Sequence, residues 1–239
     1  MRLDRYLTLC DLGSRKEVKE LIARGRVWMD GRPVRDAGMA VKGEVTVDGE
    51  PAAYRPLVAI VMNKPAGVLT ATTDRRQKPV LDLLPDSDRR RDPAPVGRLD
   101  KDTTGLLLIT DDGKAAHGLI SPKSGVEKRY RAVLDAPATQ ADVEAFARGL
   151  SLSDFEALPA KLEIGEGNVA WCTGQEGKFH QVKRMFAACG KTVLQLHRER
   201  VGSLWLPEDL APGEYRYLDM ETWNRLRAEA GLGPWQEEK

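Results

Sequence analysis

The apolar stretches of this chain are short, and this feature most restricts its fold. Leu57–Met62 is a continuous run of strand length that stops at Asn63-Lys64-Pro65, where proline does not easily continue a strand. Leu106–Thr110 is a second such run, which ends before Asp112-Gly113. No stretch approaches the roughly 18 apolar residues that span a bilayer. We therefore expect a soluble, cytoplasmic protein whose core is built largely from buried strands.

The rest of the second half of the chain also predicts short strands, with a few helices between them. Strands are expected at 129–134, 160–164, 169–173 and 193–196. Apolar residues at helical spacing predict short helices after Asp112-Gly113, after Thr139 and over 182–189. The charged segment 72–92 is expected to be an exposed loop, interrupted by a short turn of structure at 80–84. Few helices scattered among strands indicate an α+β fold with a mixed, largely antiparallel sheet.

The first fifty residues have a separate pattern. Ser14 and Glu17 form a capping box ahead of a short amphipathic helix that Gly25 can close, and Leu3, Tyr6 and Leu7 have the same spacing. Two turn pairs, Asp-Gly at 30–31 and 48–49, follow and predict a small β-element. With 239 residues the chain has room for two domains. We expect a small α/β domain at 1–50, a linker at 51–57 and a second domain at 58–239.

Charge is unevenly distributed, although the net charge is only +1. Residues 1–35 hold nine basic and five acidic side chains, a surplus of 9 − 5 = +4, and residues 175–203 hold six basic and two acidic ones, a surplus of 6 − 2 = +4. Clustered cations are what a nucleic-acid interface requires, but solvated surface faces explain such mild clusters equally well. The three cysteines form no CxxC pair and the histidines lack ligand spacing, so neither a disulfide framework nor a metal site is expected.

The most unusual string is residues 97–105, GRLDKDTTG, a polar loop bounded by glycines that leads directly into the apolar run at 106–110. Asp100 in such a loop is well placed for catalysis, because a rigid strand holds a tip that can meet a substrate. The alternative is a turn whose Asp and Thr side chains satisfy backbone donors. The residues alone leave both interpretations open.

Two further strings carry cations or an aromatic ring. Residues 176–186 place Lys178, Lys183 and Arg184 at the start of an amphipathic helix, where an anion could bind; His180 could also act as a general base or proton shuttle. Tyr130 lies in a strand on the face opposite its neighbouring arginines. It could stack on a base or belong to the core.

Together and in this order, these strings resemble the motifs of the RsuA branch of the pseudouridine synthases. The match rests on GRLDKDTTGLLLITDDG (97–113), HQVKRMFAACG (180–190), LHRERVG (196–202) and LAPGEYR (210–216), and residues 1–50 are similar to the S4 RNA-binding domain of that branch. The resemblance implies a pseudouridine synthase domain after an S4-like domain. It also implies isomerisation of one uridine, expected to be uridine 516 of 16S ribosomal RNA, without cofactor or metal.

The resemblance also implies roles for individual residues. Asp100 takes the position of the essential aspartate, either attacking the sugar or base or removing a ribose proton. Tyr130 would pack against the flipped base, and Arg98 would fill the vacated stack or hold a phosphate. Lys183, or its neighbour Arg184, would pair with Asp100. The expected RNA-binding residues are Arg98, Arg184, Asn63 and Lys64, together with Arg15, Lys16, Lys19 and Arg24 of the first domain.

Two alternatives remain open. A synthase acting on 23S ribosomal RNA shares the S4-like domain and the loop at 97–105, although the string from Phe179 to Arg184 looks like the small-subunit type. A noncatalytic ribosomal-RNA-binding assembly factor would have no need for the carboxylate of Asp100. The expected partner is 16S ribosomal RNA or a small-subunit assembly intermediate, not a membrane. We expect a monomer, because the sequence shows neither heptads nor a large apolar stripe.

Overall fold

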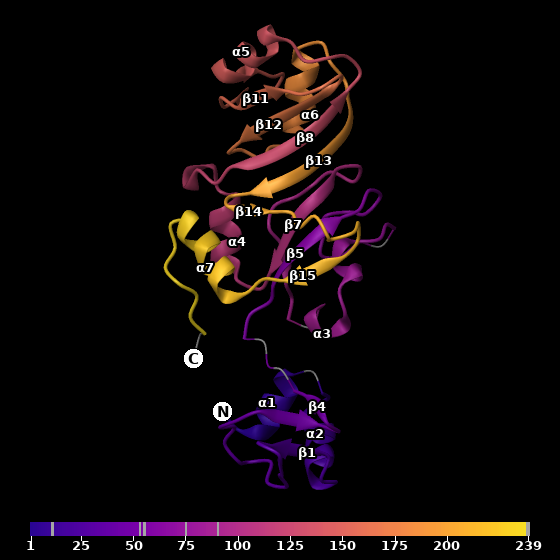
Figure 1. Cartoon of the computed structure of the whole chain (residues 1–239), viewed down its shortest axis with the longest axis vertical. Helices are drawn as coiled ribbons and strands as arrows, with labels where there is room; N and C mark the ends of the chain where they lie inside the picture. Colours follow the sequence, from indigo (N-terminus) through magenta and orange to yellow (C-terminus); the bar gives the residue numbers. More distant parts are fainter. Residues whose placement is uncertain (11, 53, 55, 75, 90, 238–239) are drawn as a thin grey trace. The chain divides into compact units, whose positions relative to one another are not determined.

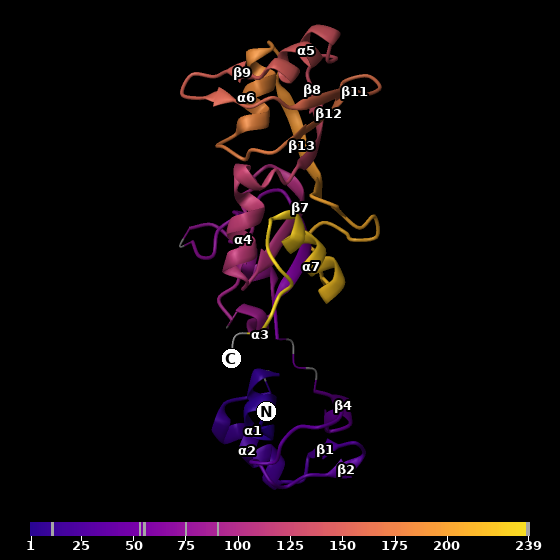
Figure 2. The same cartoon turned by 90° about the vertical axis from the view of Figure 1, so that its left-hand side faces the viewer.

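The computed structural model describes residues 1–10, 12–52, 54, 56–74, 76–89 and 91–237. The chain forms two compact units, Met1–Pro56 and Leu57–Lys239 (Figures 1 and 2). The segment expected to be a linker includes residues 53 and 55, and the segment expected to be a loop includes residues 75 and 90; these four lie outside the described residues.

The first unit packs two helices against a four-stranded antiparallel sheet of order β2-β1-β3-β4. The expected capping box is present, since the Ser14 hydroxyl accepts from the Glu17 amide and the Glu17 carboxylate accepts from the Ser14 amide at 2.7 Å. Apolar residues from both helices and from β1 and β3 are buried in one core. The elements are α1 (Leu3–Leu9), α2 (Arg15–Ala23), β1 (Val27–Met29), β2 (Arg32–Pro33), β3 (Val45–Val47) and β4 (Glu50–Pro51).

The predicted linker needs a correction at its start. Pro51 lies in β4, which pairs with β3 through Thr46–Pro51 and Val47–Glu50. Ala52 is buried in the core of the first unit. The chain therefore completes an edge strand here, because an Asp-Gly turn at 48–49 returns it to the sheet.

The second unit is built on a nine-stranded sheet of order β11-β12-β8-β13-β7-β5-β15, with β14 paired to β13 and β6 paired to β7. Its pairs are antiparallel except β13 with β7, so the expected α+β fold with a largely antiparallel sheet is confirmed. Its strands are β5 (Ala59–Lys64), β6 (Ala94–Pro95), β7 (Thr104–Thr110), β8 (Lys128–Leu134), β11 (Lys161–Ile164), β12 (Val169–Gly174), β13 (Val193–Val201), β14 (Leu204–Trp205) and β15 (Tyr215–Tyr217). A separate two-stranded sheet pairs β9 (Leu150–Ser151) with β10 (Glu156–Ala157).

Helices cover the two halves of this sheet separately. Helices α5 (Gln140–Arg148) and α6 (Gln181–Ala188) lie beside β8, β11 and β12, and Phe146 and Phe186 join the core beneath them. Helices α4 (Gly113–Ile120) and α7 (Met220–Glu229) lie near β5 and β7 in the other half (Figure 1). Alternate residues of β7 enter two cores, Leu106 and Leu108 on the side of α4 and α7, Leu107 and Ile109 on the opposite side.

The sequence pattern missed several elements of the second unit. These are α7, β15 and a short helix α3 (Asp86–Arg89) inside the expected loop, whose turn at 80–84 is a 3₁₀ helix, η1 (Val80–Leu83). A second 3₁₀ helix, η2 (Pro122–Ser124), follows α4. Within the described ranges, no helix is long and apolar enough to cross a membrane.

The two halves of the sheet meet where β13 runs parallel to β7. The register pairs His197 with Thr104 and Arg198 with Gly105. Gly105 has φ +100°, and a Cβ atom there would overlap the backbone of Arg198. Glycine is therefore required for the two strands to approach this closely. This junction brings the loop that precedes β7 to the half that carries α6.

Candidate active site

The loop at 97–105 is anchored on both sides of Asp100. The Thr70 hydroxyl donates to the Leu99 carbonyl at 2.7 Å and accepts from the Leu99 amide at 3.2 Å, while Leu99 itself is buried. The Thr103 amide donates to the Asp100 carbonyl at 3.1 Å. Since the backbone of Leu99 and the Asp100 carbonyl are held in this way, the carboxylate of Asp100 projects from an anchored support.

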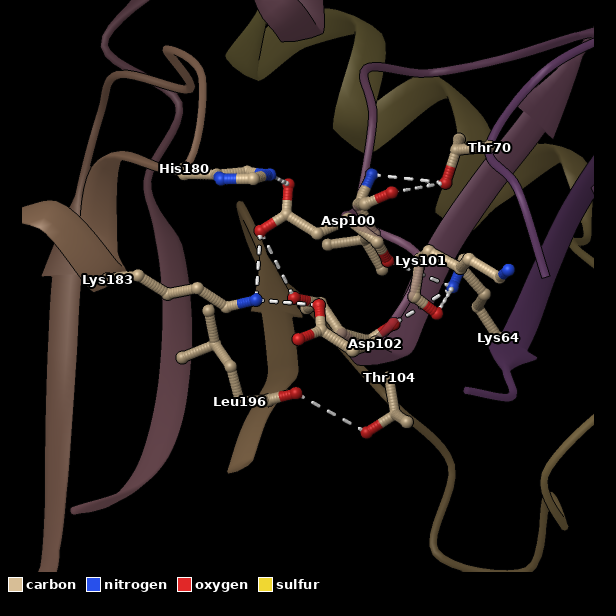
Figure 3. A network of polar contacts seen from close by, with 11 residues as sticks. Lys64, Thr70, Asp100, Lys101, Asp102, Thr104, His180, Lys183 and Leu196 are labelled. Carbon is tan, nitrogen blue, oxygen red and sulfur yellow. Dashed lines mark hydrogen bonds and ion pairs between the residues drawn. The ribbon is translucent and has the colours of Figure 1, made fainter. Parts of the chain in front are cut away.

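Lys64, at the end of β5, holds this loop from inside the protein. Its side chain is fully buried, and Nζ lies 3.0–3.3 Å from the carbonyl oxygens of Pro65, Asp100, Lys101 and Thr103. Burial lowers the pKa of Lys64 to about 8, although Asp102 and Asp100 oppose that shift. Figure 3 shows the ammonium group surrounded by the loop backbone. Lys64 therefore holds the backbone of the loop at 97–105 in place.

The carboxylate of Asp100 lies between two side chains supplied by α6 and the residue before it (Figure 3). Lys183 Nζ lies 3.4 Å from Oδ2 of Asp100 and 2.6 Å from Oδ1 of Asp102. His180 Nε2 lies 3.3 Å from Oδ1 of Asp100. The hydrogen bond from Lys183 lowers the pKa of Asp102. Lys183 thus binds both carboxylates of the loop and links the two halves of the sheet at this point.

The start of α6 aims these side chains. His180 is the N-cap residue and has a left-handed backbone, with φ +50°, and its side chain makes no capping hydrogen bond. The imidazole is therefore free to face Asp100. Lys183 follows one turn later, on the same side of the helix. Met185 and Phe186 of the same helix are buried in the core, which sets the rotation of the helix.

A small pocket of about 50 Å³ opens beside the carboxylate and is lined by Arg98, Asp100, Tyr130 and His180, among others. Tyr130, from β8, packs against the cores of both halves of the sheet. The guanidinium of Arg198 lies 6.0 Å from the centre of its ring and donates from Nε to the Leu106 carbonyl at 2.7 Å. The pocket is much smaller than the roughly 300 Å³ or more that is typical of sites for drug-sized ligands.

Of the expected site residues, Asp100, Tyr130 and Arg98 line this pocket, and Lys183 contacts Asp100 beside it. Of the two candidates for pairing with Asp100, Lys183 makes the contact. Arg184 instead binds Asp154 and the hydroxyl of Ser153, and its guanidinium lies over a phenylalanine ring.

Two residues expected to contact RNA do not fit that role. Lys64 is enclosed by carbonyl oxygens, and Asn63 is 7% exposed and donates from Nδ2 to the Leu210 carbonyl at 2.8 Å. Both are inaccessible because they end a strand that is buried along its whole length. In the first unit, the four basic residues expected to bind RNA are all exposed: Arg15, Lys16, Lys19 and Arg24.

Sequence reasoning assigned no role to Asp102 and no internal role to Lys64. Asp102 could have been noticed, since it lies in the same loop two residues after Asp100. The burial of Lys64 was suggested only by its place at the end of the apolar run. Within the part of the chain that the structure describes, no group of three or more potential ligands could hold a metal ion.

Comparison with known proteins gives the family. The model of the RNA pseudouridylate synthase family matches residues 58–188, and that of the S4 domain matches residues 1–47. A protein of Bacillus subtilis named as an uncharacterized RNA pseudouridine synthase is 46% identical, with 95% of this chain and 98% of that protein covered.

Proteins named ribosomal small subunit pseudouridine synthase A are similarly close. The one from Vibrio cholerae is 44% identical and the one from Escherichia coli K12 is 42% identical, and each comparison covers 92% of this chain and 97% of the relative. A crystal structure described as a pseudouridylate synthase matches with a TM-score of 0.68 and 32% identity, over 95% of this chain and 99% of that one. The chain therefore belongs to the RNA pseudouridylate synthase family.

Proposed function

We propose that this enzyme converts one specific uridine of small-subunit ribosomal RNA, the equivalent of uridine 516, to pseudouridine, with Asp100 as the catalytic group. The observation that carries the proposal is the carboxylate of Asp100, held between Lys183 and His180 at the wall of a pocket that also contains Tyr130. The choice of RNA is supported by the names of relatives that are 42–44% identical over most of the chain.

The reaction breaks the bond between N1 of uracil and C1′ of ribose, and forms a bond between C5 and C1′. The proton on C5 is lost and N1 gains one, so the product is an isomer of the substrate. Asp100 can serve by adding to the sugar or base, or by removing a proton from the ribose. In either case the carboxylate reacts as an anion, and the ammonium of Lys183, 3.4 Å away, is its ion-pair partner.

The target base must leave its stack to reach Asp100, because the carboxylate lies at the wall of a pocket. Tyr130 would face the flipped uracil with its ring. Arg98 is exposed at the pocket, and its charge suits an RNA phosphate or the space that the flipped base leaves.

Carbodiimide labelling with primer extension tests the proposal on ribosomal RNA and on small-subunit assembly intermediates. The wild-type protein should place one new mark in small-subunit RNA, and Asp100→Asn should abolish it. Asp102→Asn is the matched control, since Asp102 is largely exposed and also binds Lys183. The control should keep the mark. A mark in large-subunit RNA would favour the alternative substrate, and no mark on any RNA would favour the binding-factor hypothesis.

We further propose that the first unit contributes binding that is largely independent of sequence, through the exposed residues Arg15, Lys16, Lys19 and Arg24. The logarithm of the affinity for RNA should fall linearly with the logarithm of the salt concentration. Replacing Lys16 and Lys19 together by Gln should make that slope shallower. An affinity that does not depend on salt would contradict this role.

A further inference from the structure

Phe179 is the most exposed large apolar side chain within the described segments, with 68% of its surface accessible. It lies in the loop between β12 and α6, immediately before His180. The rings of Phe179 and His180 stack at a centroid distance of 3.8 Å, with an angle of 18° between their planes. The stacked pair therefore exposes the ring of Phe179 to solvent. Packing in the hydrophobic core does not explain why an aromatic side chain stands at this position.

The ring pair is held at the rim of the pocket. His180 connects it to the site, because its Nε2 lies 3.3 Å from Asp100 and its ring lines the same pocket. The side chain of Gln181 holds the loop on either side of the pair. Its Oε1 accepts from the backbone amide of Lys178 at 3.0 Å, and its Nε2 donates to the carboxylate of Glu176 at 2.9 Å. The pair thus keeps one position relative to the catalytic carboxylate.

The surroundings favour RNA over an apolar protein surface. Arg98 lines the same pocket, is exposed, and has no carboxylate partner among the residues described, whereas Lys178 is paired with Glu176 and Lys183 with Asp100 and Asp102. A surface that combines an open aromatic face with the unpaired cation of Arg98 matches an unpaired nucleotide, which offers a flat base and a phosphate. Moreover, when the target uridine flips into the pocket, its neighbour loses a stacking partner.

We propose that Phe179, supported by His180, forms a stacking subsite for the unpaired base next to the target uridine. This proposal rests on the proposed function and adds a determinant of substrate choice to it. Stacking on an aromatic ring tolerates any base, so the subsite selects for an unpaired neighbour more than for its identity. It thereby favours uridines in loops or in locally opened RNA.

Steady-state kinetics with RNA labelled with tritium at C5 of uridine test the subsite, because pseudouridine formation releases that label. We expect Phe179→Ala to raise KM about tenfold, the order that the loss of one stacked base gives, with kcat within threefold of wild type. Phe179→Tyr should keep the KM of wild type, whereas Phe179→Leu should raise KM as Phe179→Ala does. Ile164→Ala is the matched control: Ile164 is 46% exposed at the end of edge strand β11, and its removal should leave both constants unchanged.

A binding measurement separates this proposal from the proposed function. RNA that carries 2-aminopurine next to the target uridine should lose fluorescence on binding to the wild-type protein, keep it with Phe179→Ala, and lose it again with Phe179→Tyr. The stacking role is wrong if Phe179→Leu keeps the KM of wild type as well as Phe179→Tyr does. It is also wrong if Phe179→Ala lowers kcat and leaves KM unchanged. Quenching that depends on Phe179 without release of tritium would retain the subsite and reject the catalytic proposal.

Discussion

Replacement of Lys64 by Met separates the positioning of the loop at 97–105 from the stability of the fold. Methionine has a similar length and remains compatible with burial, but it cannot donate to the carbonyl oxygens of Pro65, Asp100, Lys101 and Thr103. The loop would then lose its internal support while β5 keeps its apolar neighbours.

The expected cost in stability is small because two effects offset each other. An ammonium group has three hydrogens, and three hydrogen bonds to a charged group contribute about 4.5 kcal/mol at about 1.5 kcal/mol each. Against this, the difference between a pKa of 10.5 and one of about 8 means that the buried charge costs about 3.4 kcal/mol at neutral pH, at about 1.36 kcal/mol per pH unit. The free energy of unfolding of Lys64→Met should therefore fall by only about 1 kcal/mol.

The effect on rate should be much larger, because a displacement of about 1 Å in a reacting group can cost about 100-fold. Urea unfolding and tritium release measure the two quantities on the same preparation. Lys101→Met removes an exposed cation of the same loop and should leave kcat nearly unchanged. If Lys64→Met keeps kcat within threefold of wild type at pH 7, Lys64 does not position the loop. The reasoning would also be refuted if the activity of Lys64→Met fell only in proportion to the fraction of unfolded protein.

The dependence on pH has opposite signs for stability and for activity. The pKa of Lys64 is lower in the folded protein than in the unfolded chain, so between about pH 8 and 10.5 the unfolded chain binds more protons. The stability of wild type relative to Lys64→Met should therefore rise with pH across that window. Activity should fall as pH rises through about 8, because a neutral amine has only two hydrogens for four carbonyl oxygens.

Two further predictions concern pairs of charged side chains. Lys183→Met should lower kcat about 100-fold by releasing Asp100, whereas Arg184→Met should change kcat little, since Arg184 binds a neighbouring loop; tritium release compares the two. Arg227→Met should lower the free energy of unfolding by about 3–5 kcal/mol and leave the pocket intact. The reason is that the buried carboxylate of Asp112, the N-cap of α4, loses its cation. Urea unfolding measures the loss, and a change below about 1 kcal/mol would contradict the prediction.

The parts of the fold that could be predicted from sequence are those with strong local signals. The capping box of α2 and the apolar run of β5 each depend on neighbouring residues. By contrast, β15 has only three residues and exists because it pairs with β5, far away in the sequence. Helix α7 buries few apolar residues, among them Trp223 and Leu226, so its amphipathic pattern is weak. Tertiary contacts determine both elements.

The site divides in the same way. Asp100, Tyr130 and Lys183 could be proposed from the sequence because of the resemblance to the family, and the structure places Asp100 and Tyr130 at one pocket and Lys183 in contact with Asp100. The internal role of Lys64 could not, since its four acceptors are backbone atoms whose positions depend on how the loop folds over β5. The choice between Lys183 and Arg184 likewise required the rotation of α6, which packing of Met185 and Phe186 sets.

The short parallel pairing of β7 with β13 also has a consequence for the order in which the enzyme becomes functional. Asp100 and its loop are synthesised well before Lys183, and β13 follows later still. An incomplete chain can pair β5 with β7, but it lacks both the strand that joins the two halves and helix α7, which completes the core beside β7. Contacts between residues so distant in sequence form slowly and late. A nascent molecule should therefore be catalytically silent until nearly its whole length has emerged from the ribosome.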